Sequence, residues 1–439
     1  MIQPTRRTVW LLAAGVPVAL LPAFVDARLW TAWLAVVGGA LIAIGLDALL
    51  TLPASRLEVE TRAPKQIYAG DEGALVLSLG APSWERPTRL QALVDLDPAL
   101  LEPQPTVERI VPAGGRAEAS LKLVPRRRGL AAVRTLWLRV YGPLGLVVRI
   151  VSRPLDHEVE VVPDVGAVRA AALRLFGTKE HATGIKVERY LGDGSEFDSL
   201  REFVPGFDAR SIDWKATARH VKLMVREFRA ERNHQVVLAF DTGRLMGEPL
   251  DGLPKLDHAI NGGLVLAYVC LRTGDRVGLF AFDAEPRAFV APVGGVRAFD
   301  RVRSGTADLE YATAETNYTL GIADLSTRLK RRSLVVVFTD FVDTVTAELM
   351  VENMDRLARR HLVLFVALAD PSLQAVARGE PATLDLLHRA VVAADLERER
   401  ALVLKRLIRS GVHCIDAAPR AISTPLLNRY LEIRRRELV

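Results

Sequence analysis

Two long apolar runs near the start of the sequence constrain the fold more than any other feature. Residues 8–25 carry no charge, and residues 29–52 carry only Asp47. A helix needs about 20 apolar residues to cross a bilayer, so both runs predict spanning helices, the first narrowly. The connector at 26–28 is so short that the two helices must form an antiparallel hairpin. A cleaved signal peptide would explain the first run alone.

Basic residues flank this predicted hairpin of residues 1–55 on both outer sides. They are Arg6, Arg7, Arg56, Arg62 and Lys65. Because positive charge is retained in the cytoplasm, both termini are expected there, in a multi-pass protein of the inner (cytoplasmic) membrane. Asp47 is expected close enough to the inner boundary to reach headgroup water. A functional carboxylate within the membrane is the alternative.

The bulk composition excludes some classes of partner. A net charge of +6 over 439 residues is compatible with anionic lipid but too small to predict nucleic-acid binding. The mean hydropathy of +0.17 is high for a soluble protein, and the excess lies in the N-terminal runs. Cys270 and Cys414 lie in apolar runs and form no metal-binding pattern, which predicts buried thiols in a reducing compartment.

Residues 56–165 show short alternating apolar runs. Examples are residues 75–79, 119–123 and 136–140, with glycine- and proline-containing turn signals between such runs. Strands at this spacing predict a β-rich, antiparallel, sandwich-like domain. The basic run at 126–128 suits a solvated sheet edge, or a contact with lipid headgroups.

Residues 166–232 form a segment dense in paired charges and aromatic side chains. Asp208 or Ser211 is expected to cap a short helix over 212–220, and a strand is expected over 222–228. Two interpretations stay open, namely that the charges fasten the segment to the next domain or that they bind a partner. The candidate partner-binding residues are Arg201, Asp208, Arg210, Asp213, Trp214, Lys215 and Arg219.

Residues 233–439 alternate between continuous apolar strands and amphipathic helices. Strands are expected at 235–240, 276–282, 288–293, 333–339, 362–368 and 412–415. Helices are expected near 256–272, 320–331, 347–357 and 384–409. This alternation predicts a parallel α/β sheet covered on both faces. Asp241 and Asp340 end two of its strands, where ligands of such sheets bind.

Three stretches carry a resemblance to a known family. They are residues 192–219 (GDGSEFDSLREFVPGFDARSIDWKATAR), 331–340 (RRSLVVVFTD) and 126–146 (RRRGLAAVRTLWLRVYGPLGL). With the run into Asp241, they resemble the "domain of unknown function 58" family over most of the chain beyond the hairpin. The resemblance implies a von Willebrand factor A-like (Rossmann-like) fold for the carboxyl half.

The resemblance also implies a metal site, which this sequence matches in part. An intact A-domain site uses Asp-x-Ser-x-Ser, a later Thr and a later Asp. Here Asp241, Thr316 and Asp340 match, whereas Gly243 and Leu245 stand at the two serine positions. Such a degenerate site is expected to bind no cofactor, or Mg²⁺ only weakly.

The function that follows is an interaction module without catalytic residues. The resemblance implies a protein partner, a MoxR-type AAA+ ATPase, and a role in the assembly or maturation of other proteins, beside the lipid bilayer that holds the anchor. The alternative is a metal-dependent hydrolase that uses Asp241 and Asp340. It is disfavoured because no histidine or nucleophile falls in a matching motif.

Overall fold

The computed structural model describes residues 1–24, 29–163, 191–204, 212–220, 222–229, 234–295, 297–342, 344–345, 347–380 and 382–436. They belong to two compact units, Met1–Pro163 and Asp164–Val439. The helix connector at 26–28 and the candidate residues Asp208 and Arg210 lie outside the described residues.

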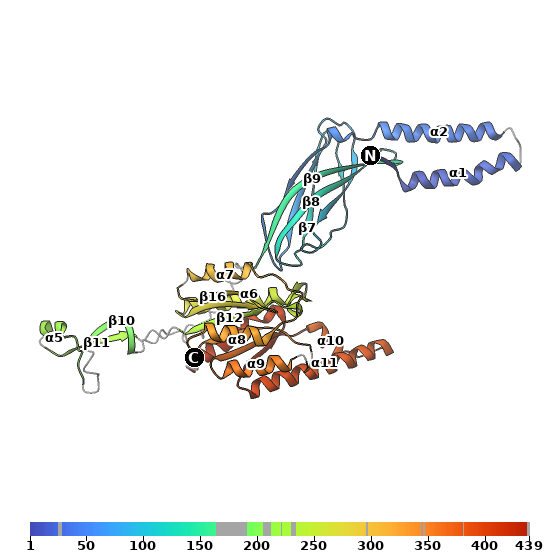
Figure 1. The fold of residues 1–439 in the computed structure, drawn as a ribbon. Coiled ribbons are helices and arrows are strands. Elements are labelled where there is room, and N and C mark those ends of the chain that lie inside the picture. The colour runs from blue at the N-terminus through green and yellow to red at the C-terminus, as the bar shows by residue number, and fades with distance from the viewer. Residues whose placement is uncertain are drawn as a thin grey trace. The chain divides into compact units, whose positions relative to one another are not determined.

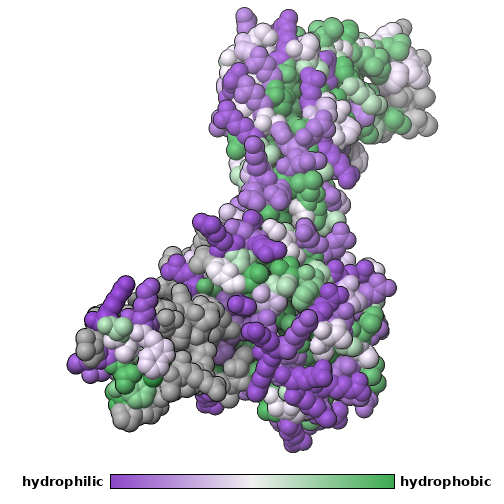
Figure 2. All heavy atoms as spheres, turned by 60° about the vertical axis from the view of Figure 1, so that its left-hand side comes forward, coloured by the Kyte–Doolittle hydropathy of each residue, from purple (hydrophilic) through white to green (hydrophobic). Residues whose placement is uncertain are grey.

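Two apolar helices, α1 (Arg6–Phe24) and α2 (Leu29–Leu49), extend from the first unit side by side (Figure 1). The Trp33 indole approaches the Gly15 carbonyl across them, at 3.5 Å. Their hydrophobic side chains gather at the upper right of Figure 2. Among the described residues, one helical stretch, Trp33–Arg56, is long and apolar enough to cross a membrane.

The remainder of the first unit is built from two packed sheets, of order β1-β9-β8-β5-β6 with β3 beside β9, and β2-β4-β7. Side chains in these strands are alternately buried and exposed, as in β5. This alternation is typical of a sheet that has one buried face and one solvated face. The predicted sandwich-like domain is confirmed, although β3 runs parallel to β9. The strands are β1 (Ile2–Pro4), β2 (Glu58–Arg62), β3 (Gln66–Tyr68), β4 (Gly73–Gly80), β5 (Thr88–Leu96), β6 (Val107–Val111), β7 (Arg116–Leu123), β8 (Gly129–Tyr141) and β9 (Val147–Val162).

Asp47, near the end of α2, is fully buried and fastens this helix to the loop between β8 and β9. Its Oδ1 accepts the Leu144 N–H at 2.7 Å, and its Oδ2 accepts the N–H groups of Leu146 at 2.7 Å and Val147 at 2.8 Å. Gly142 completes the fit, since a Cβ there would stand 2.5 Å from the carboxylate. The expectation that Asp47 reaches headgroup water is therefore wrong, because both of its carboxylate oxygens are buried and accept hydrogen bonds from backbone N–H groups of this loop.

The same loop holds the beginning of α1. The Thr5 hydroxyl donates to the Gly145 carbonyl at 2.7 Å, and the Thr8 hydroxyl donates to the Leu146 carbonyl. Just before them, β1 pairs with β9 in antiparallel register. The two helices thus start and finish on one sandwich.

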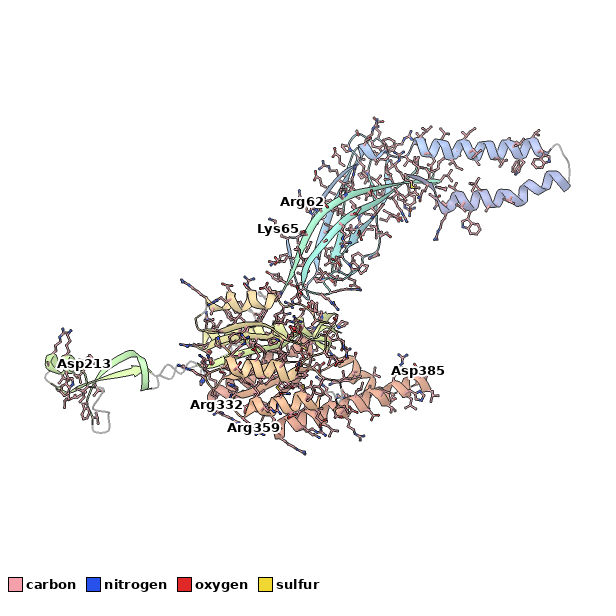
Figure 3. The ribbon with its side chains drawn as sticks, viewed as in Figure 1. Arg62, Lys65, Asp213, Arg332, Arg359 and Asp385 are labelled. Atoms are coloured by element: carbon pink, nitrogen blue, oxygen red, sulfur yellow. The ribbon has the colours of Figure 1, made fainter. Side chains whose placement is uncertain are left out.

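The charged segment of the second unit folds as a two-stranded sheet with a short helix. β10 (Leu191–Glu202) pairs antiparallel with β11 (Met224–Arg229), and α5 (Trp214–His220) connects to them in sequence. Asp213 stands at the start of α5 (Figure 3), where its Oδ1 accepts the Lys215 and Ala216 N–H groups at 2.9 and 3.0 Å.

Asp213 is thus the N-cap of α5. The expectation that Asp208 or Ser211 caps this helix is wrong, because the helix begins at Trp214 and the residue directly before it supplies the acceptor.

A six-stranded sheet of order β16-β15-β12-β17-β18-β19 forms the centre of the second unit. All neighbours are parallel except β16, which returns antiparallel to β15 as the sequence predicts. Both faces are buried, which explains why the strands are apolar throughout. The strands are β12 (Gln235–Asp241), β15 (Arg276–Phe282), β16 (Pro286–Val293), β17 (Leu334–Phe338), β18 (Leu362–Leu368) and β19 (His413–Ala417).

Helices cover both faces of this sheet (Figure 1). One core contains side chains of α6, α7 and α12, and the other contains side chains of α8, α9 and α11. The predicted doubly covered α/β architecture is confirmed. The helices are α6 (Lys255–Arg272), α7 (Ala298–Ala307), α8 (Tyr318–Arg328), α9 (Glu348–Ala358), α10 (Pro371–Arg378), α11 (Leu384–Arg409) and α12 (Ser423–Arg435).

Candidate functional site

The candidate site lies at the C-terminal edge of the sheet. Asp241 is the last residue of β12, and Asp340 follows β17, the strand beside it. The chain leaves β12 toward β15 on one side, whereas β17 lies on the other, so the strand order reverses here. Ligands of open α/β sheets bind at such a reversal. The fold therefore places Asp241 and Asp340 at the ends of neighbouring strands, as the sequence predicts.

Asp241 is buried and surrounded by donors. Its Oδ1 accepts the Thr316 hydroxyl at 2.6 Å and the Gly243 N–H at 2.8 Å. Its Oδ2 accepts the Thr339 hydroxyl at 2.6 Å and, at 3.4 Å, that of Tyr318. Burial raises the pKa of Asp241, and these bonds counter the rise only in part.

Thr316 occupies the space that a serine side chain at position 243 would need. A Cβ built on Gly243 would stand 2.1 Å from Thr316 Oγ1 and 3.0 Å from Asp241 Oδ1. Glycine at position 243, where an intact site has its first serine, therefore leaves room for Thr316 to donate its hydroxyl directly to Asp241.

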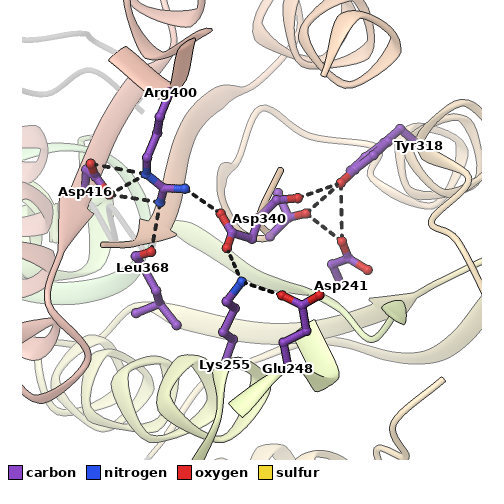
Figure 4. A network of polar contacts seen from close by, with 9 residues as sticks. Asp241, Glu248, Lys255, Tyr318, Asp340, Leu368, Arg400 and Asp416 are labelled. Carbon is purple, nitrogen blue, oxygen red and sulfur yellow. Dashed lines mark hydrogen bonds and ion pairs between the residues drawn. The ribbon is translucent and has the colours of Figure 1, made fainter. Parts of the chain in front are cut away.

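Asp340 is bound by two protein cations (Figure 4). Lys255 Nζ lies 2.7 Å from its Oδ2, and Arg400 Nη1 lies 2.8 Å from its Oδ1. Each cation has a further acidic partner, because Lys255 contacts Glu248 at 3.1 Å and Arg400 contacts Asp416 at 3.0 Å. The side chain of Asp340 is 6% exposed, so solvent screens these pairs little.

Both cations stay charged in this setting. Burial alone would lower the pKa of Lys255, but the carboxylates of Asp340 and Glu248 outweigh it and raise that pKa. Burial likewise opposes the charge of Arg400, and Asp340 and Asp416 outweigh it, so the pKa of the guanidinium rises.

The residues present fit a metal ion poorly. Every oxygen of the Asp241 and Asp340 carboxylates already accepts a bond from a protein donor. Within the described ranges, no group of three or more His, Cys, Asp or Glu side chains is placed to hold a metal. The expected weak cation site at Asp241, Thr316 and Asp340 stays a prediction.

The other candidate residues occupy separate elements. Arg201 lies on β10, and Asp213 caps α5. Trp214 is 70% exposed, and Lys215 and Arg219 are exposed on the same short helix.

Exposed apolar side chains also lie at this edge of the sheet, in the loop that follows β17 and in the first turns of α8 and α9. Val342 and Val345, in the loop after β17, are 46% and 79% exposed, and Leu349 in the first turn of α9 is 61% exposed. Leu320, in the first turn of α8, is 44% exposed. We call these four residues the apolar rim.

Sequence reasoning missed Lys255 and Arg400. A signal for Arg400 was present, since it falls at helical spacing with the buried residues Ala393, Val403 and Leu407 of α11. An arginine in an apolar stripe needs buried carboxylates. Lys255 carried a weaker signal, as a cation in the first turn of α6, where the helix dipole disfavours it.

Comparison with known proteins gives one family. The family model "Protein of unknown function DUF58" matches residues 199–400. "Uncharacterized protein Mb1516" of Mycobacterium bovis and "Uncharacterized protein Rv1480" of Mycobacterium tuberculosis are each 28% identical over 211 residues. The match covers 46% of this chain and 65% of each relative, so it spans less than two thirds of their length.

Solved structures give distant likenesses. The conserved hypothetical protein BatB from Bacteroides thetaiotaomicron is 12% identical with a TM-score of 0.29, over 44% of this chain and 96% of that one. An aerotolerance-related membrane protein from Bacteroides fragilis is 13% identical with a TM-score of 0.29, over 46% of this chain and 100% of that one. The strand order above, rather than these likenesses, defines the fold.

Proposed function

Because residues 199–400 form a DUF58 domain, we propose that this chain is a membrane-anchored cytoplasmic interaction module. Its von Willebrand factor A-like domain binds a protein partner, a MoxR-type AAA+ ATPase, and the pair assembles or matures other proteins. The observation that carries the proposal is the apolar rim, which lies at the same edge of the sheet as the closed polar network. Exposed apolar side chains clustered on one edge of a domain mark protein-binding surfaces.

The anchor is a two-helix hairpin in the inner membrane. The support is that β1 precedes α1, the strands after α2 follow it, and both belong to one sandwich. A chain that leaves and rejoins one domain must cross the membrane an even number of times. Since α2 is apolar enough to cross, α1 supplies the return crossing. By the positive-inside rule, Arg6, Arg7 and Arg56 support a cytoplasmic position for the sandwich.

Two measurements test the anchor. The full chain should stay with membranes after carbonate extraction, and recovery in the soluble fraction would disprove the hairpin. A reporter that is active only outside the cytoplasm, fused after Val439, should stay silent. Activity from that fusion would overturn the orientation.

The interaction face is tested with charge substitutions on the apolar rim. Val345→Glu and Leu349→Glu should lower co-purification of the MoxR-type ATPase from detergent-solubilised membranes at least tenfold, because each places a charge in an apolar contact. Both positions are exposed, so the melting temperature should hardly change.

Ile408→Glu is the matched control. Ile408 is 57% exposed near the end of α11, just before β19 begins, and so lies at the opposite edge of the sheet from the rim. Equal co-purification of all three variants would exclude the rim as the binding face.

A further inference from the structure

We infer that Lys255 and Arg400 are resident cations of the Asp340 site and take the place of the divalent metal that the resemblance implies. The inference does not depend on the proposed function, because its test needs no partner.

The geometry around Lys255 is that of a cation-binding site already filled. Its Nζ lies 2.7 Å from Asp340 Oδ2 and 3.1 Å from Glu248 Oε2, and its side chain is only 14% exposed. Carboxylate oxygens converging on one point are the ligands that hard divalent cations select. Here they converge on an ammonium.

Arg400 closes the other side of Asp340. Its guanidinium donates to Asp340, to Asp416 and, at 2.9 Å, to the Leu368 carbonyl (Figure 4). It lies over the Phe341 ring, 5.2 Å from the centroid. These four partners hold the guanidinium beside Asp340, where an ion would otherwise bind.

The positions of Lys255 and Arg400 would be unfavourable for a cation without the carboxylates that surround them. Lys255 begins α6, where its charge opposes the helix dipole, and Arg400 lies within the buried stripe of α11. The carboxylates they meet explain why they are tolerated. A divalent ion bound to Asp340 would be repelled by the positive charges of Lys255 and Arg400, which both contact the same carboxylate.

Removing the ammonium should therefore uncover a metal site. We expect the full-length Lys255→Met variant in detergent to melt at a lower temperature than the wild type, because Asp340 and Glu248 lose a shared counter-ion. Mn²⁺ in the ~1 mM range, where weak protein sites bind hard cations, should restore much of that loss. Electron paramagnetic resonance should show one bound Mn²⁺ in the variant, and the wild type should show neither effect.

Two further variants make the result specific. Lys122→Met removes a lysine that is also 2.7 Å from a glutamate, Glu72, but is 67% exposed, so it should gain no Mn²⁺ binding. Adding Glu248→Gln to Lys255→Met removes a ligand, so Mn²⁺ binding should fall at least tenfold.

A folded Lys255→Met variant that gains no Mn²⁺ would overturn the inference. If that variant does not fold, the wild type decides. If the wild type binds Mn²⁺ stoichiometrically and Asp340→Asn abolishes that binding, the inference is refuted. If neither Mn²⁺ nor a chelator changes the melting temperature of the wild type, the inference is supported.

Discussion

Substitution of Asp47 tests how firmly the sandwich holds helix α2. In Asp47→Ala, the backbone N–H groups of Leu144, Leu146 and Val147 lose their acceptor in a fully buried position. A hydrogen bond to a charged group contributes about 1.5 to 3 kcal/mol. Three such bonds at the lower value predict a loss of about 4 to 5 kcal/mol, a large part of the stability of an ordinary domain.

Asp47→Asn is the finer probe. The amide oxygen can keep the two bonds from Leu146 and Val147, but its NH₂ group then faces the Leu144 N–H, another donor. One charge-assisted bond is lost, so we expect a loss of about 1.5 to 3 kcal/mol. In a unit of this size that loss lowers the melting temperature by roughly 3 to 12 °C.

Hydrogen exchange of the peptide that contains residues 142–147, followed by mass spectrometry, measures the effect where it arises. The Ala variant should exchange this peptide about a thousandfold faster, provided exchange follows the opening equilibrium. Glu72→Gln is the matched control, because it also replaces a carboxylate but in an exposed ion pair with Lys122, worth about 0.5 kcal/mol. The reasoning is refuted if Asp47→Asn changes exchange and melting no more than Glu72→Gln does.

Three further predictions concern the second unit. Gly243→Ser should lower the melting temperature, because its Cβ would stand 2.1 Å from Thr316 Oγ1. Gly247→Ser is the control, because its Cβ would stand 3.9 Å from the nearest atom. Equal effects of the two variants in calorimetry would contradict the closed site. Burial raises the pKa of Asp241, so the wild type should lose stability as pH rises from the ordinary value of about 3.9 through the raised pKa. Asp241→Asn should lack that loss, and denaturant titrations showing the same pH dependence in both proteins would count against it. Trp214→Ala should change the unfolding free energy by less than about 0.5 kcal/mol, since the ring is 70% exposed, and a loss of ATPase capture in that variant alone would move the binding face to α5.

The architecture was predictable wherever one periodicity dominated. The strands of the α/β sheet are apolar throughout because both faces are covered. The helix expected near 347–357 is also present, and it buries Met350, Met354 and Leu357 at helical spacing. Helices α7, α10 and α12 were missed. α7 and α10 are only 10 and 8 residues long, so neither carries a long apolar stripe. α12 does bury Leu426, Tyr430 and Ile433 on one face, but arginines and other polar residues interrupt its sequence.

The candidate site was predictable only where it follows a motif. Asp241, Thr316 and Asp340 were found because their strand ends and sequence contexts are local features. Lys255 and Arg400 were not, because the ion pairs that define them join residues on different elements, 60 positions apart between Asp340 and Arg400. Asp47 was misjudged for the same reason, since its partners lie 97 to 100 positions later in the chain.

The pairing of β1 with β9 sets an order of events during synthesis. Ile2 is made 147 residues before its partner Arg149, so at 5 to 20 residues per second the pair can form only about 7 to 30 seconds after Ile2 is made. Asp47 waits for the loop at 144–147 in the same way. Both helices are therefore complete long before the sandwich that fastens them can close. In the proposed hairpin, the helix pair would therefore enter the bilayer before the sandwich folds, and the sandwich would close onto helices that the membrane already holds.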